Sequence, residues 1–255
     1  VDVRAGLVLG MQRYRDADLY RFGYPRDVTG QNVYKATLVR LGNYETLHPD
    51  RFRELIAFTR ARAYARLGDY ATAVRFCGQT VELDGDLRER AAADRAMFED
   101  FGRAIALESE AGTLEGFRDR LGDRIDRCRA LVDRYTTAPW QSLAKVEWEQ
   151  AEVDLVEFLW ANRQVIAGGP REALEMLNEM RERHSESQNV HRHTMRLGDW
   201  HAELAREYAI LSPPERLAPP DRASFVWEEF EKWTTRAKEL YLEVAQRYGA
   251  DERLE

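Results

Sequence analysis

Cysteine is scarce in this chain of 255 residues, and no long apolar run is present. Two cysteines, Cys77 and Cys128, are too few for a disulfide framework or a zinc site. Each falls in an amphipathic helical stretch, so we expect both to be small, buried hydrophobic side chains. Because no apolar run is long enough to cross a bilayer, we expect no transmembrane segment.

Basic residues are outnumbered by acidic ones, 38 to 45, which gives a formal net charge of −7. Nucleic-acid-binding proteins normally carry a basic surface that neutralises phosphates, so this balance argues against a nucleic-acid partner. Lysine occurs at only four positions, so nearly all cations are arginines, and arginine is interleaved with acids, as in residues 86–90. Such mixing is typical of solvated helix surfaces with ion pairs.

Motifs of common enzyme classes are also missing. No glycine-rich loop has the lysine and the preceding strand of a phosphate-binding loop, and no Gly-x-Ser-x-Gly turn occurs. His191, His193 and His201 lie near Asp199, but their spacings do not place three ligands on one helix face within reach of one ion. We therefore expect solvated or capping histidines, no catalytic residue, no metal and no cofactor.

Helical periodicity runs through the chain, and no segment alternates like a β-strand. The pattern predicts an all-α fold with helices at residues 29–41, 50–67, 70–83, 87–107, 113–135, 140–166, 171–183 and 190–210. Residues 212–221 contain four prolines and predict an extended linker. We expect a helical domain over residues 1–211, this linker, and a C-terminal helix within residues 222–255.

The C-terminal helix has the clearest apolar stripe of the chain. Its members recur at spacings of three and four: Val226, Phe230, Trp233, Ala237, Tyr241 and Val244. Such a stripe must be buried against another surface. We expect it to cap the last hairpin of its own chain, with docking on another chain as the alternative.

The tetrapeptide Arg-Leu-Gly-(Asp/Asn) occurs four times, with its glycine at Gly42, Gly68, Gly122 and Gly198. Glycine takes the left-handed conformation easily at a helix end, and Asp or Asn can then cap the next helix. The spacings of 26, 54 and 76 residues are not a fixed period. They predict one hairpin turn at Gly68 and helix-end signals at the other copies, with a continuing helix as the alternative at Gly122.

The copy at Gly68 belongs to a longer pattern of small and aromatic residues. Ala61 and Ala73 are small where two helices would approach each other, Tyr64 is aromatic one turn after Ala61, and Gly68-Asp69-Tyr70 forms the turn between them. On these residues, 54–87 resemble one tetratricopeptide repeat, a helix-turn-helix unit of about 34 residues. Residues 154–187 resemble a second, weaker copy.

The resemblance implies a tetratricopeptide-like α-solenoid of antiparallel helical hairpins, with an irregular helical bundle as the alternative. In such arrays the first helix of each hairpin lines a concave surface. The similarity therefore places five residues on a partner-binding surface: Phe58, Arg62, Arg66, Phe158 and Asn162. An arginine pair beside an aromatic ring could hold a carboxylate, and the alternative is that these residues contact neighbouring helices.

These observations predict a non-catalytic adaptor or assembly scaffold that binds a protein or peptide partner. The alternatives are a structural subunit of a larger complex, buried on several faces, and a helical enzyme with an unrecognised site. Helix endings recur as well: residues 237–248 resemble residues 173–184, each with a ring eleven residues after the alanine, Tyr248 and His184. These endings resemble those of bacterial envelope repeat proteins, which favours a periplasmic or envelope location over the cytoplasm. A chain that starts at Val1 also fits removal of a secretory signal.

Overall fold

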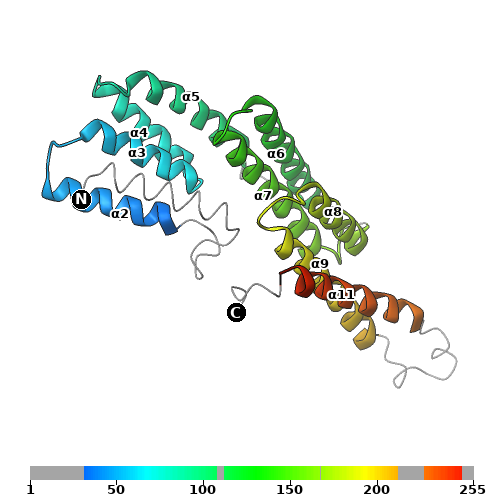
Figure 1. Ribbon diagram of the computed structural model, residues 1–255. Coiled ribbons are helices and arrows are strands. Elements are labelled where there is room, and N and C mark those ends of the chain that lie inside the picture. The colour runs from blue at the N-terminus through cyan, green and yellow to red at the C-terminus, as the bar shows by residue number, and fades with distance from the viewer. Residues whose placement is uncertain (1–31, 108–111, 167, 212–226, 249–255) are drawn as a thin grey trace. The chain divides into compact units, whose positions relative to one another are not determined.

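The computed structural model describes residues 32–107, 112–166, 168–211 and 227–248, and its regular structure there is entirely helical (Figure 1). The helices are α2 (Asn32–Leu47), α3 (Arg53–Arg66), α4 (Tyr70–Glu82), α5 (Arg88–Ile105), α6 (Leu114–Arg134), α7 (Trp140–Ala161), α8 (Gly169–Arg183), α9 (Val190–Leu211) and α11 (Trp227–Tyr248). The prediction of an all-α fold is confirmed. The predicted linker at 212–221 lies outside the described residues.

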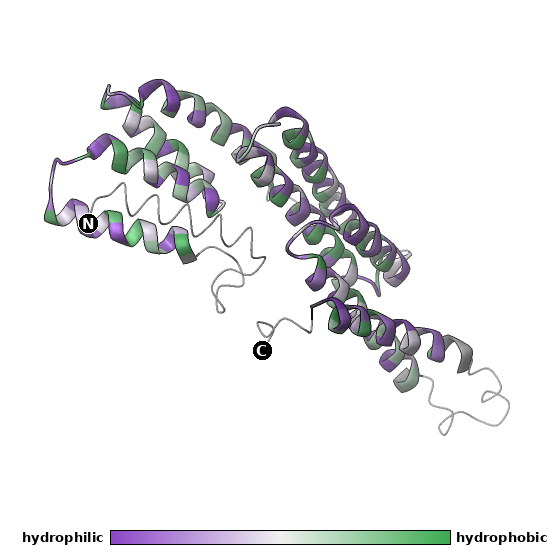
Figure 2. Ribbon diagram, in the orientation of Figure 1, coloured by the Kyte–Doolittle hydropathy of each residue, from purple (hydrophilic) through white to green (hydrophobic). Residues whose placement is uncertain are grey.

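Each helix carries both hydrophilic and hydrophobic residues (Figure 2). Many hydrophobic residues of the part that the structure describes are buried in its cores, and many charged residues form ion pairs along its helices. No helix among the described residues combines the length and the apolar character that crossing a membrane requires.

The turn between α3 and α4 follows directly from the sequence around Gly68. Gly68 has a φ of 78°, a left-handed conformation that only glycine adopts without a steric cost. The N–H of Gly68 donates to the carbonyl of Ala65, and the N–H of Asp69 donates to the carbonyl of Tyr64. These two hydrogen bonds form a Schellman motif. The Asp69 carboxylate then accepts from the N–H of Thr72 at 3.0 Å and caps α4.

The other copies of the tetrapeptide do not end helices. Gly42 lies inside α2, Gly122 inside α6 and Gly198 inside α9. The prediction of helix-end signals is therefore wrong at these three positions, and the alternative of a continuing helix holds at Gly122. The physical reason is that the helical pattern continues past each of these glycines, so the backbone keeps its right-handed hydrogen bonds and glycine merely lowers the local helix propensity.

The chain divides into two compact units, residues 1–155 and 156–255. The core of the first unit joins side chains of α3 to α7, and Phe98 and Phe101 of α5 are fully buried in it. The Tyr70 ring packs on both of them, with ring centroids 6.4 and 5.3 Å away. Ala61 and Ala73 are also fully buried, which allows α3 and α4 to approach closely.

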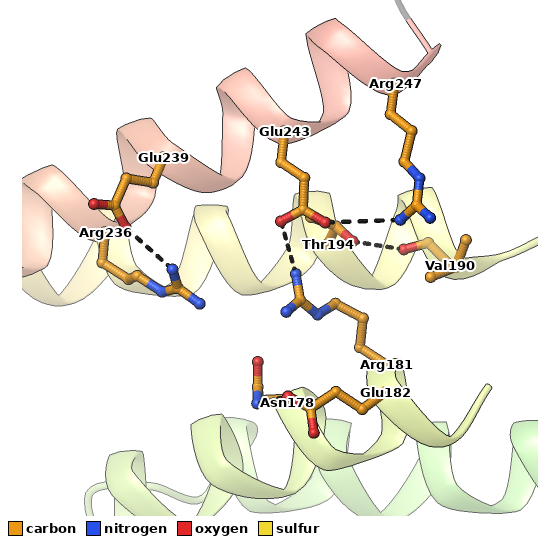
Figure 3. Close-up of polar contacts among 9 residues, drawn as sticks. All are labelled: Asn178, Arg181, Glu182, Val190, Thr194, Arg236, Glu239, Glu243 and Arg247. Carbon is orange, nitrogen blue, oxygen red and sulfur yellow. Dashed lines mark hydrogen bonds and ion pairs between the residues drawn. The ribbon is translucent and has the colours of Figure 1, made fainter. Parts of the chain in front are cut away.

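In the second unit, α11 packs against its own chain. A side-chain carbon at Gly198 of α9 would lie 2.9 Å from Cε1 of Tyr241, so this glycine makes room for the ring. The hydroxyl of Tyr241 donates to Asp199 at 2.7 Å. Figure 3 shows a further link, in which Glu243 of α11 accepts from Arg181 of α8 at 3.0 Å.

Candidate functional site

The three residues predicted on α3 lie together in the first unit. Phe58 is buried, with 5% of its surface exposed, and Arg62 and Arg66 are half-buried. The Nε of Arg62 donates to Asp94 of α5 at 3.1 Å. Arg62 therefore contacts a neighbouring helix, as the alternative from the sequence had it. Arg62 also belongs to a larger set of arginines and aromatic rings.

That arrangement alternates guanidinium groups and aromatic rings, and we call it the arginine–aromatic ladder. The Cζ atoms of Arg90 and Arg62 lie 5.6 and 5.2 Å from the centroid of the Phe58 ring. The Cζ atoms of Arg62 and Arg66 lie 5.1 and 5.8 Å from the centroid of the Trp140 ring. The ladder thus joins α3, α5 and the start of α7, and each contact is within cation–π range.

Charge accumulates around Arg62. Burial is the main cause that lowers the pKa of Arg62, and the nearby guanidinium groups of Arg90 and Arg66 lower it further. The carboxylate of Asp94 opposes them, while burial raises the pKa of Asp94 itself. A second anion beside the ladder would reduce the repulsion among the three arginines, so the ladder is suited to bind a carboxylate.

Parts of the ladder remain accessible in the described structure. Arg90 is exposed, and Arg66 and Trp140 are half-buried. Phe58 is buried and contacts the guanidinium groups of Arg62 and Arg90. The arrangement offers planar cations that can bind a carboxylate in bidentate fashion, next to an indole ring that supplies apolar contact.

A second polar cluster connects α4, α6 and α7 deeper in the same unit. The hydroxyl of Tyr70 donates to Oε1 of Glu147 at 2.6 Å, and burial raises the pKa of this carboxyl group. Arg124 is 8% exposed and forms an ion pair with Asp154 on α7. Tyr70 and Arg124 each follow an Arg-Leu-Gly-Asp copy directly, so equivalent positions of two copies both bind carboxylates of α7. Because their partners are within the chain, these groups hold helices together.

The residues predicted in the weaker repeat lie in the second unit, where Phe158 and Asn162 are half-buried. The Asn162 amide donates to the carbonyl of Phe158 at 2.8 Å, and α7 ends at Ala161. Asn162 therefore closes the end of its own helix. The neighbouring Trp160 stacks on Trp200 at 4.4 Å, with Arg163 over the Trp160 ring at 4.3 Å.

On α9, His193 is buried and His191 and His201 are half-buried, so the expectation of a solvated side chain is wrong for His193. His193 is 4% exposed, and the ring of His201 lies 5.3 Å from that of Trp233. Burial lowers the pKa of His201 to about 4. The sequence suggested solvation because these histidines follow one another among polar residues, whereas α11 covers this part of α9.

Over the described ranges, no group of three or more His, Cys, Asp or Glu side chains could hold a metal ion. The two cysteines are buried thiols, as expected. Burial raises the pKa of Cys77 to about 12 and that of Cys128 to about 11, so both are poor nucleophiles at neutral pH.

Sequence reasoning missed Arg90, Asp94 and Trp140. A signal for the first two was present, because Arg90 and Asp94 follow Phe58 and Arg62 by 32 residues, close to one repeat length. No repeat-length spacing relates Trp140 to the other ladder residues. It reaches the ladder because the start of α7 packs on α3 and α5. The chain matches no protein-family model and no curated protein.

Proposed function

We propose that this protein is a non-catalytic interaction protein that holds an acidic segment of a partner protein on the arginine–aromatic ladder of its first unit. The observation that carries the proposal is the set of cation–π contacts of Arg62 and Arg66 with Trp140, together with that of Arg90 with Phe58. We further propose that the helical hairpins form a tetratricopeptide-like solenoid, with the resemblance of residues 54–87 as support.

Two physical arguments favour an acidic ligand: the repulsion among the ladder's guanidinium groups and the restriction of those groups by the rings. The ladder already brings three guanidinium groups near one buried carboxylate, Asp94, so a second carboxylate would offset repulsion that exists before binding. The ring contacts restrict the guanidinium groups of the ladder, which reduces the entropy lost when they bind. Arginine and tryptophan are also the residues that most often dominate binding energy at protein interfaces.

The accessible members of the ladder can be tested without disturbing its buried ion pair. The variant to compare with the wild type is Arg66→Gln with Arg90→Gln, which leaves Arg62 and Asp94 in place. The matched control is Arg75→Gln with Arg129→Gln, two exposed arginines of α4 and α6 that lie outside the ladder. Both variants remove two positive charges, so nonspecific attraction of acidic molecules falls equally.

The three proteins would be incubated with an array of short peptides of random sequence. We expect the wild type and the control to retain peptides rich in Asp and Glu, and the ladder variant to bind them about tenfold less, because charge-assisted hydrogen bonds are lost. Circular dichroism would establish that both variants keep their helices. Equal retention of acidic peptides by the two variants, or no acidic preference in the wild type, would show that the ladder is not the binding site.

A further inference from the structure

A groove runs between α9 and α11 in the second unit, with a volume of about 680 Å³. Apolar side chains form most of its lining, among them the ring of Phe230, the ring of Tyr241 and the side chain of Leu242. Leu242 is 47% exposed, so a large apolar side chain lies open to solvent at the edge of the groove. Alanines form the rest of the apolar lining, and they leave space for a helix to approach closely.

Contacts outside the lining hold the groove in shape. Gly198 and Asp199 of α9 fix the ring and the hydroxyl of Tyr241. Glu243, one residue after Leu242, is ion-paired with Arg181 of α8 (Figure 3). Since α11 is held at several points, the groove exists before any partner binds, which lowers the entropic cost of binding.

The charged residues in the lining of the groove are cations, while the carboxylate of Asp199 beside it accepts a hydrogen bond from the hydroxyl of Tyr241. Among the described residues that line it, the charged side chains are Arg206 of α9 and Lys238 of α11, and both are exposed. A second copy of the chain, docked through the same groove about a two-fold axis, would bring the same cations together, which disfavours self-association.

We propose that this groove binds an amphipathic helix of a partner protein, whose apolar stripe fills the groove and whose flanking Asp and Glu residues face Arg206 and Lys238. Helix-in-groove recognition requires an apolar channel between helices and a rim that selects charge, and this site has both. The proposal concerns the second unit and stands independently of the arginine–aromatic ladder.

The test uses the full chain and two synthetic helical peptides with the same alanine and leucine stripe. One peptide carries glutamates beside the stripe, and the other carries lysines at the same positions. Fluorescence anisotropy of labelled peptide would measure both affinities for the wild type, for Arg206→Glu with Lys238→Glu, and for a control. The control is Arg129→Glu with Lys232→Glu, which reverses two exposed charges outside the groove.

We expect the wild type and the control to bind the glutamate peptide at least tenfold more tightly than the lysine peptide. The groove variant should prefer the lysine peptide, a gain of binding that an unfolded protein would not show. Equal affinity for both peptides in the wild type, or no reversal in the groove variant, would overturn the proposal. Sedimentation of the chain alone would also overturn it if the chain dimerised and Leu242→Glu abolished the dimer.

Discussion

Alanine substitution at the glycines of the Arg-Leu-Gly-Asp copies should change stability in opposite directions, although the surrounding tetrapeptide is the same. Gly68 and Gly122 are the informative pair, because both lie in the first unit. Gly68 has left-handed backbone at the end of α3, whereas Gly122 lies inside α6. At both positions the Cβ of an alanine would meet no other atom within 4 Å. The relevant difference between the two sites is therefore backbone conformation.

The magnitudes follow from that conformation. At Gly68 an alanine would have to adopt the left-handed region, which costs roughly 1–2 kcal/mol. At Gly122 an alanine meets no steric obstacle and restricts the unfolded chain, so it should stabilise by about 0.5–1 kcal/mol. The two variants should thus differ by about 1.5–3 kcal/mol in the free energy of unfolding. With a urea slope of about 2 kcal/mol per molar, their midpoints should lie on opposite sides of the wild type.

Urea unfolding followed by circular dichroism gives the midpoints, and hydrogen exchange with mass spectrometry assigns the change to a unit. We expect peptides from α3 to α6 to exchange faster in Gly68→Ala and more slowly in Gly122→Ala, with peptides from α8 and α9 unchanged in both. A shift of both midpoints in the same direction would refute the reasoning, since it would mean that the identity of the tetrapeptide matters more than its backbone.

Three further predictions concern polar groups. Burial lowers the pKa of His201 from 6.5 to about 4, so as pH falls the unfolded state binds a proton before the folded state does. The folded state should therefore lose stability on the order of 1 kcal/mol between pH 6.5 and 4. The His201→Gln variant should show a flatter pH profile of urea midpoints over this range than the wild type. Asp154→Ala leaves the buried Arg124 without its ion pair and should lower the free energy of unfolding by about 2–3 kcal/mol, whereas leucine at both positions should restore most of this loss. Tyr241→Phe removes the hydrogen bond to Asp199 and should cost about 1 kcal/mol, seen as faster hydrogen exchange of α11.

Sequence periodicity predicted where most helices lie, because it reports directly which faces are buried; the ends of some were wrong, since α2 continues to Leu47 rather than ending at residue 41. The expected ranges 70–83, 113–135 and 190–210 lie within about a residue of α4, α6 and α9. The turn at Gly68 could also be predicted, since its glycine, its capping aspartate and the alanines on either side all indicate the same hairpin. Agreement among several local signals is what makes such a prediction reliable.

The candidate site was only partly predictable. The resemblance of residues 54–87 to a tetratricopeptide repeat placed Phe58, Arg62 and Arg66 on one surface, and the structure brings these three residues together. Trp140 could not, because its place in the ladder depends on how the start of α7 packs on two helices far earlier in the sequence. The groove beside α11 was also hidden, since the stripe that includes Tyr241 predicts a buried face but not which of its residues the neighbouring helix leaves uncovered.

The polar pairs of α7 show why small-residue helical hairpins need more than apolar packing. Several buried positions in the first unit are alanines, and small side chains interdigitate less than large ones, so they constrain the register between helices less. Tyr70 and Arg124 have directional bonds to Glu147 and Asp154, and a shifted helix would leave these groups buried without partners. A buried ion pair adds little net stability compared with apolar residues of similar size. If the double leucine variant at Arg124 and Asp154 keeps the wild-type stability, selection of one register is the role that remains for this pair.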